Sequence, residues 1–157
     1  MKFKMLGLAL SLTAAFGLVA CSDDSSSSGS KGGVDECKVT REGGKVFVKL
    51  VDDGVTMNTT RSIDADGVIT EIAKFSGKVS KADFDASCKE QQDDKTNLSV
   101  ECDESTKTIT GTYKDEDIED ADDLEADDRF MCEMMLDPEG FLQDIENAAD
   151  EAGEDED

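Results

Sequence analysis

Histidine and tryptophan are absent from this sequence, and tyrosine and proline each occur once in its 157 residues. Without histidine, the chain lacks the commonest general base and cannot form the Ser-His and Cys-His pairs of nucleophilic catalysis. A pair of carboxylates can still hydrolyse a glycoside. Sugar-binding clefts, however, usually stack aromatic rings, which are scarce here. We therefore expect no enzyme activity, with a small hydrolase that acts through carboxylates as the alternative.

Basic residues are also scarce, since 16 lysines and arginines face 39 acidic residues and the formal net charge is −23. The acidity is concentrated towards the C-terminus, where residues 115–157 contain 21 acidic residues and one basic residue, Arg129. Nucleic acids and anionic membrane surfaces attract clusters of lysine and arginine, so we expect no nucleic-acid partner. An acidic surface suits a basic protein or a cation instead.

No complete metal-binding motif occurs in the chain. Residues 62–69 resemble part of a calcium-binding loop, with aspartate at its third and fifth positions and glycine at its sixth. The first position is Ser62 and the twelfth is Ala73, where a bidentate glutamate is needed. We therefore predict a hairpin turn here, with no metal and no cofactor. Loose calcium uptake by the acidic C-terminal segment is left as an alternative, as in a calcium-assisted binding module.

The N-terminus has the pattern of an export signal. Lys2 and Lys4 precede an apolar run over residues 5–20. A membrane-spanning helix needs about 20 apolar residues, and this run is shorter. A basic start, a short apolar stretch and small residues at the end are typical of a secretory signal peptide. We assign residues 1–20 to such a peptide.

The end of this segment reads Leu18, Val19, Ala20, Cys21. It resembles the lipobox of bacterial lipoproteins at all four positions. The resemblance implies that Leu18, Val19 and Ala20 are recognised by the lipoprotein signal peptidase and that the Cys21 thiol carries diacylglycerol. It also implies acylation of the new amino group, so that membrane lipid is a partner through Cys21. Since Ser22 rather than aspartate follows the cysteine, the resemblance favours the outer membrane over the inner one.

The rest of the chain divides by composition. Residues 21–33 hold the lipidated cysteine and a linker rich in serine, glycine and aspartate, which we expect to be flexible. Residues 34–149 should form one small domain, with its acidic segment starting at residue 115. Residues 150–157 should be a disordered acidic tail.

Within the domain, alternating apolar residues predict strands near residues 36–42, 45–52, 54–63 and 67–76, joined by glycine-containing turns. Ser80 and Asp83 form a variant of the capping box, which predicts a helix to about Gln92 with Phe84 and Cys88 facing inward. Residues 97–102 and 106–113 resemble a second hairpin. The pattern predicts an α+β fold, with an antiparallel meander sheet and a helix packed on one face.

The C-terminal segment is harder to interpret. Residues 129–136 fit the end of a helix or a strand, and we favour the helix. Asp137, Pro138 and Glu139 form a good helix start. The apolar strand residues divide between two faces of the predicted sheet. One face carries Phe47, Val51, Ile69, Ala73 and Phe75, and the other carries Val46, Val48, Leu50, Val68 and Ile72. Two apolar faces need two covers, so we expect residues 130–149 to fold over the second face.

Four cysteines remain after the lipidation site, namely Cys37, Cys88, Cys102 and Cys132. An even number in an exported chain favours disulfides, and the lack of histidine and of Cys-x-x-Cys spacing disfavours zinc and thiol-redox roles. Three pairings exist. We prefer Cys88–Cys102, which ties the helix to the next strand, and Cys37–Cys132, which ties the first strand to the C-terminal segment.

The sequence thus predicts a lipid-anchored protein of the cell envelope that acts as a non-catalytic binding or structural module. A small envelope hydrolase and a calcium-assisted binding module are the alternatives.

Overall fold

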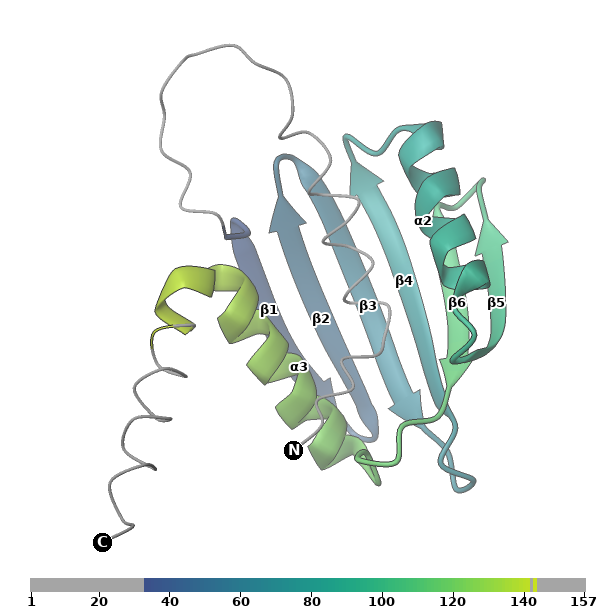
Figure 1. Cartoon of the computed structure of the whole chain (residues 1–157), viewed down its shortest axis with the longest axis vertical. Coiled ribbons are helices and arrows are strands. Elements are labelled where there is room, and N and C mark those ends of the chain that lie inside the picture. Colours follow the sequence, from purple (N-terminus) through teal and green to yellow (C-terminus); the bar gives the residue numbers. More distant parts are fainter. Residues whose placement is uncertain (1–32, 142, 144–157) are drawn as a thin grey trace, which may run out of the picture.

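A computed structural model describes residues 33–141 and 143 of the chain. In this part of the chain, one six-stranded antiparallel sheet carries two helices (Figure 1), which confirms the predicted α+β fold. The elements in chain order are β1 (Glu36–Glu42), β2 (Lys45–Asp52), β3 (Val55–Ile63), β4 (Ile69–Gly77), α2 (Lys81–Asp93), β5 (Asn97–Asp103), β6 (Thr108–Tyr113) and α3 (Ala121–Leu136).

The sheet begins as a meander, since β1 to β4 are neighbours in chain order. The chain then crosses through α2 to β5 at the far edge, and β6 returns between β4 and β5 to give the order β1-β2-β3-β4-β6-β5. The first two turns use positive φ angles at Gly43 (60°) and at Asp53 and Gly54 (44° and 80°). Glycine adopts these angles at little cost, which is why the predicted strand boundaries lie close to the observed ones.

Helix α2 starts with the predicted capping box. The Ser80 side chain accepts a hydrogen bond from the Asp83 amide, and the Asp83 carboxylate accepts one from the Ser80 amide. Phe84 is buried and its ring meets Phe75 edge-on, with 6.1 Å between the ring centroids.

Residues 121–136 of the C-terminal segment form helix α3, as favoured from the sequence. Asp120 caps α3 by accepting hydrogen bonds from the amides of Asp122 and Asp123. Residues 129–136 belong to this helix, so the strand alternative is wrong. A helical turn follows at residues 138–141, where Asp137 accepts hydrogen bonds from the Gly140 and Phe141 amides, as expected of a cap before Pro138.

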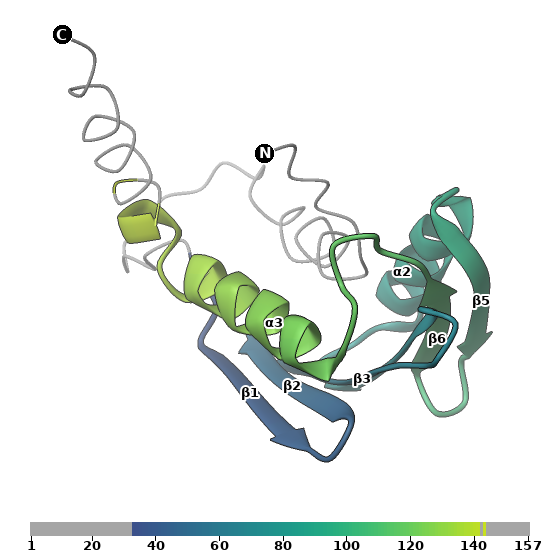
Figure 2. The ribbon, with the colours of Figure 1, turned by 90° about the horizontal axis from the view of Figure 1, so that it is seen from below.

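Both helices pack on the same face of the sheet (Figure 2), so the prediction that the C-terminal segment covers a second apolar face is wrong. The error comes from register. Ile69, Ala73 and Phe75 lie on the same face as Val48 and Leu50, because Val48 pairs with Thr59 and Thr59 pairs with Ala73. Residue 142 and residues 144–149 of the predicted cover lie outside the described residues.

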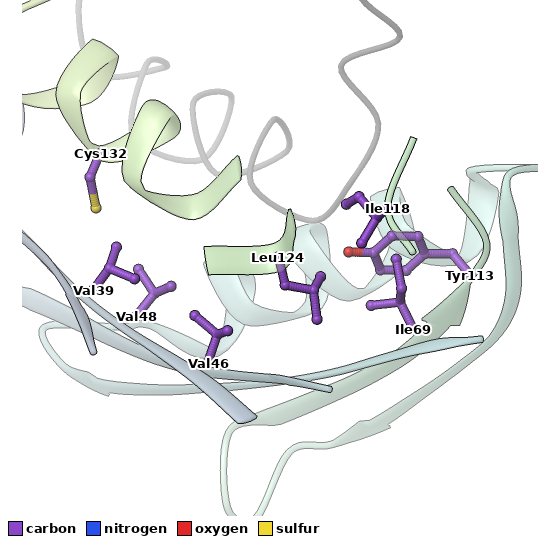
Figure 3. Close-up of a cluster of buried hydrophobic side chains, with 8 residues drawn as sticks. All are labelled: Val39, Val46, Val48, Ile69, Tyr113, Ile118, Leu124 and Cys132. Carbon is purple, nitrogen blue, oxygen red and sulfur yellow. The ribbon is translucent and has the colours of Figure 1, made fainter. Parts of the chain in front are cut away.

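The buried face divides into two clusters, one under each helix. Under α3, Leu124 and Cys132 contact residues of β1, β2, β4 and β6 (Figure 3), namely Val39, Val46, Val48, Ile69 and Tyr113, together with Ile118 from the preceding loop. Under α2, Phe84 packs on Leu50, Met57, Ala73, Phe75 and Ile109. Each helix therefore covers one half of a single apolar sheet surface.

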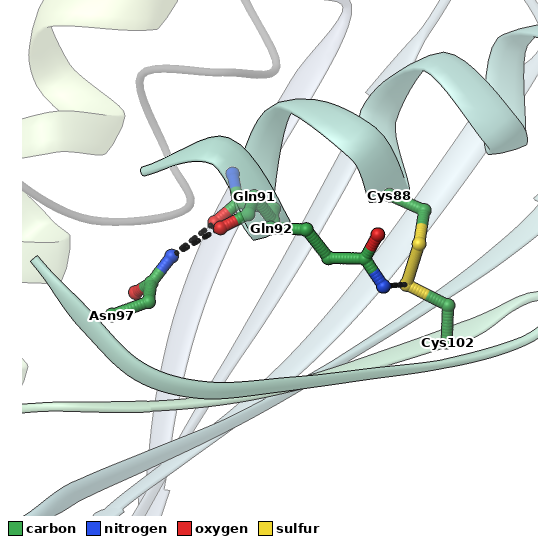
Figure 4. Close-up of a disulfide and its surroundings, with 5 residues drawn as sticks. All are labelled: Cys88, Gln91, Gln92, Asn97 and Cys102. Atoms are coloured by element: carbon green, nitrogen blue, oxygen red, sulfur yellow. Dashed lines mark hydrogen bonds between the residues drawn. A yellow bond between two sulfur atoms is a disulfide. The ribbon is translucent and has the colours of Figure 1, made fainter. Parts of the chain in front are cut away.

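The structure contains two disulfides, so the expectation of disulfide bonds is confirmed, and the pairs are those preferred from the sequence. Cys37–Cys132 joins β1 to α3, and Cys88–Cys102 joins α2 to β5 (Figure 4). Next to the second bridge, Asn97 donates hydrogen bonds to the backbone and side-chain oxygens of Gln91 (Figure 4). Each disulfide thus fixes one helix to an edge strand of the sheet.

Candidate functional site

A group of buried charged residues lies between α3 and the sheet. Arg61 of β3 and Glu71 of β4 pair directly in the sheet, and both side chains point to the helix-covered face. Asp128 lies on the inner side of α3, one turn from Leu124 and one turn from Cys132. The exposed fractions of Arg61, Glu71 and Asp128 are only 6%, 5% and 6%. Three ionisable groups therefore share one buried space, which we call the Arg61 cluster.

Arg61 is the centre of this cluster. Its Nη1 atom lies 2.5 Å from Asp128 Oδ1 and 2.9 Å from Asp127 Oδ2, and its Nη2 atom donates a 2.5 Å hydrogen bond to the Tyr113 hydroxyl. The tyrosine hydroxyl in turn donates to Glu71 Oε2 at 3.5 Å. The guanidinium of Arg61 on β3 thus reaches β6 and α3 by hydrogen bonds, and Glu71 of β4 by an ion pair and through Tyr113.

The hydrogen bonding of the cluster is incomplete. Arg61 Nε lies 3.6 Å from Glu71 Oε2 and makes no hydrogen bond with a described residue. Asp128 Oδ2 and the Thr59 hydroxyl are also buried without a hydrogen-bond partner in this part of the chain. Such unpaired buried groups raise the free energy of the folded state and favour the neutral form of a carboxylate.

The pKa values of the two buried carboxylates reflect this environment. Burial raises the pKa of Glu71 from 4.5 to about 7, although the charge of Arg61 opposes the shift. Burial also raises the pKa of Asp128 from 3.8 to about 6 against the same opposing charge. For Arg61, burial lowers the pKa, but Tyr113, Asp128 and Glu71 outweigh it and the pKa is raised. The arginine is therefore charged, while Glu71 is close to half-protonated at neutral pH.

The buried position of these carboxylates suits an ion-pair network that stabilises the fold better than it suits a catalytic site. A general acid must reach its substrate, whereas Glu71 and Asp128 are buried and face an arginine inside the core. The elevated carboxylate pKa values are of the kind that general acids use, but such shifts also occur in structural ion-pair networks. The Arg61 cluster fastens α3 to the centre of the sheet.

The opposite face of the sheet carries no helix in the described part of the chain. None of its outward side chains is buried, and Ile72 of β4 is 42% exposed. The outward residues of the four inner strands are chiefly threonine, serine and lysine. We call this surface the open face, defined by Lys45, Phe47, Lys49, Val51, Thr56, Asn58, Thr60, Ser62, Thr70, Ile72, Lys74, Ser76, Thr108, Thr110 and Thr112.

The sequence-predicted site residues fall into three groups. Leu18, Val19, Ala20 and Cys21 lie outside the described residues. The other four cysteines form the two disulfides. The calcium-like segment is a hairpin turn in which Asp64 Oδ1 accepts hydrogen bonds from the Asp66 and Val68 amides, and no group of potential metal ligands occurs among the described residues.

Sequence reasoning missed the Arg61 cluster, although one signal for it was present. Leu124, Asp128 and Cys132 are spaced four residues apart, so an acidic residue interrupts the apolar stripe of a predicted helix. Such a residue is buried and needs a cationic partner.

No described helix is long and apolar enough to span a membrane. Comparison with known proteins adds no further residues, since no family model, curated protein or solved structure matches the chain.

Proposed function

We propose that this protein is an exported, lipid-anchored module of the bacterial cell envelope that binds a partner and does not catalyse a reaction. The observation that carries the binding role is the open face, which is formed by the four inner strands on the side of the sheet that no described helix covers. Sheets in compact domains can expose one face, but the exposed side is then polar and available for contact.

Two features support the export and anchoring part of the proposal. The lipobox-like residues Leu18 to Cys21 provide the lipid site, and two acyl chains or more hold a protein stably on a membrane. The disulfides Cys37–Cys132 and Cys88–Cys102 fit an oxidising compartment outside the cytoplasm. The outer membrane is the favoured location, because Ser22 follows the lipidated cysteine.

The Arg61 cluster supports the non-catalytic part. Its two carboxylates would be the natural acid and base of a hydrolase that lacks histidine, yet both are held by Arg61 in the core. Asp128 is therefore engaged in holding α3 to the sheet, and Glu71 in its contacts with Arg61 and Tyr113, which leaves the protein surface for binding.

Anchoring is tested by membrane fractionation of the producing bacterium. The full chain and its Cys21→Ser variant are expressed at equal levels, and each is followed in membrane and soluble fractions and by incorporation of labelled palmitate. We expect the full chain in the membrane fraction with label, and the variant in the soluble fraction without label. A Cys37→Ser/Cys132→Ser variant is the control, because it also loses cysteines but keeps Cys21 and should keep the label. Equal membrane association and labelling of the Cys21→Ser variant would overturn the anchoring proposal.

A further inference from the structure

Acidic residues are absent from the open face, although a quarter of the chain is acidic. Of the 157 residues 39 are aspartate or glutamate, yet the outward positions of β2, β3, β4 and β6 contain none. Instead they carry three lysines, Lys45, Lys49 and Lys74. The acidic side chains of α3 project from the other side of the sheet, so lysine supplies all of the charge at the outward positions of these four strands.

Three lysines of this side stand in one line across the strands. Lys38 of β1 pairs with Lys49 of β2, Lys49 pairs with Asn58 of β3, and Asn58 pairs with Lys74 of β4. Neighbouring strands are about 4.8 Å apart, so the line from Lys38 to Lys74 spans about 15 Å and runs perpendicular to the strands. It has the form of a track rather than a patch.

The ammonium groups of this track are available. Lys38 and Lys74 are exposed and form no ion pair with a described residue. Lys49 contacts Glu36 at 2.9 Å, with both side chains about half exposed. An exposed pair of this kind contributes between 0 and about 1 kcal/mol, so an anionic ligand can displace Glu36.

A second line of side chains lies directly beside the track. Thr40, Phe47, Thr60, Ile72 and Thr110 pair with one another across β1, β2, β3, β4 and β6. Threonine hydroxyls both donate and accept hydrogen bonds, and Phe47 and Ile72 offer apolar surface between them. Cations beside hydroxyl and apolar groups match a polymer that alternates charged groups with hydroxyl-bearing rings.

The distribution of acids favours a thin polymer over a flat anionic surface. The outer strands bring Glu36 and Glu42 on β1 and Glu101 and Asp103 on β5 to the same side of the sheet. A bilayer covering the whole side would meet these four acids as well as the four lysines, whereas a single strand along the track meets three lysines and, of these acids, Glu36. Single-stranded nucleic acid is disfavoured, because its bases stack on several aromatic side chains and this face has only Phe47. A sugar ring can instead be held through hydrogen bonds to its hydroxyl groups, which the adjoining threonines offer.

We propose that the track of Lys38, Lys49 and Lys74 on the open side of the sheet binds a linear anionic polysaccharide, with the adjoining threonine line contacting its sugar hydroxyls. This inference rests on the proposed function as a binding module, and it names the class of partner.

The test uses residues 22–157, which contain every described strand, helix and disulfide. Binding to polygalacturonate, a linear polyuronate, is measured by calorimetry between 50 and 200 mM salt. The same polymer with its carboxylates methyl-esterified is the uncharged control. The Lys49→Gln/Lys74→Gln variant is compared with Lys89→Gln/Lys95→Gln, which removes two exposed lysines in and after α2.

We expect wild type to bind polygalacturonate but not its ester. Each track lysine should raise the affinity for polygalacturonate about fivefold. The Lys49→Gln/Lys74→Gln variant should therefore bind about 25-fold more weakly than wild type, and its affinity should depend less steeply on salt. The control pair should bind like wild type, and Glu36→Gln, which frees Lys49, should bind more tightly. Circular dichroism checks that each variant is folded, and the Glu36→Gln gain does not depend on a loss of structure.

Several results would overturn the inference. These are no binding by wild type, equal weakening in both lysine pairs, equal binding of a single-stranded oligonucleotide, or binding of anionic phospholipid vesicles without binding of the polyuronate. The palmitate and fractionation experiment is independent of these measurements, so failure of the polysaccharide and failure of lipid anchoring can be told apart.

Discussion

The strongest quantitative expectation concerns Glu71 and the pH dependence of stability. The folded state raises the pKa of Glu71 from its ordinary 4.5 to about 7, chiefly by burial. Between these two values the folded chain keeps a proton that the unfolded chain releases. The free energy of unfolding therefore falls as the pH rises from about 4.5 to about 7, and Glu71 contributes no further change above that. The shift corresponds to about 3 kcal/mol at most.

The Glu71→Gln variant removes this linkage. Glutamine resembles the protonated glutamate in shape and charge, so the variant should match wild type near pH 5. At pH 8 wild type buries two carboxylates against one arginine, whereas the variant buries Asp128 alone with Arg61. We expect Glu71→Gln to be more stable than wild type at pH 8 by about 1–3 kcal/mol. A smaller slope should remain, because burial also raises the pKa of Asp128 to about 6.

Urea unfolding with the disulfides intact measures this effect at pH 5, 6, 7 and 8, in 0.3 M salt to screen the general repulsion of a highly acidic chain. Glu101→Gln is the matched control, since Glu101 is exposed on β5 and the substitution removes the same charge. It should keep the wild-type slope. If Glu71→Gln and Glu101→Gln show the same dependence on pH as wild type, the buried carboxylate is not the source of the slope and the reasoning is refuted.

Three further predictions concern the core. Arg61→Met leaves two buried carboxylates without their cation and should lower the free energy of unfolding by about 3–5 kcal/mol, measured in urea at pH 7; a loss below 1 kcal/mol would contradict the burial of the cluster. Ile69→Ala should lower the free energy of unfolding by about 2–5 kcal/mol, because this side chain is fully buried. Ile72→Ala should lower it by less than about 1 kcal/mol, because Ile72 is 42% exposed. Equal losses in thermal melts would show that the register is wrong. Replacing both cysteines of Cys37–Cys132 by serine should lower the free energy of unfolding by about 5 kcal/mol, and the same change at Cys88–Cys102 should lower it by about 3 kcal/mol. The difference arises because the sequence separations are 95 and 14 residues. A lower urea midpoint for the variant without Cys88–Cys102 would contradict this.

The local elements were predictable because their signals are local. Alternation marked the strands, positive-φ turns such as Gly43 and Gly54 separated them, and Ser80 with Asp83 marked the start of α2. The register between strands was not predictable in this way. Alternation shows that Ile69 and Ile72 lie on opposite faces, but only the pairing of β4 with β3 shows which of the two faces the helices. The sequence interpretation placed Ile69 on the outer face and Ile72 on the inner one. This exchange produced an apparent second apolar face, and with it the incorrect prediction that residues 130–149 cover that face.

The Arg61 cluster could not be predicted from the sequence, because it too depends on how the strands pair. Arg61 and Glu71 each read as an ordinary polar residue of a strand, and their common burial depends on the direct β3–β4 pair. Asp128 was the accessible signal, because it interrupts the stripe from Leu124 to Cys132 on α3. The large number of acids around it concealed that one of them faces inward. The charge distribution of the open face likewise emerges only when the residues of its four strands are placed side by side.

The most direct test of lipid anchoring is the intact mass of the mature protein purified from the producing bacterium. The proposal predicts a chain that begins at Cys21, lacks residues 1–20, and carries the added mass of at least a diacylglyceryl group. Fragmentation should place all of this added mass on Cys21. A mature chain that begins at any other residue, or one that begins at Cys21 with an unmodified thiol, would contradict it.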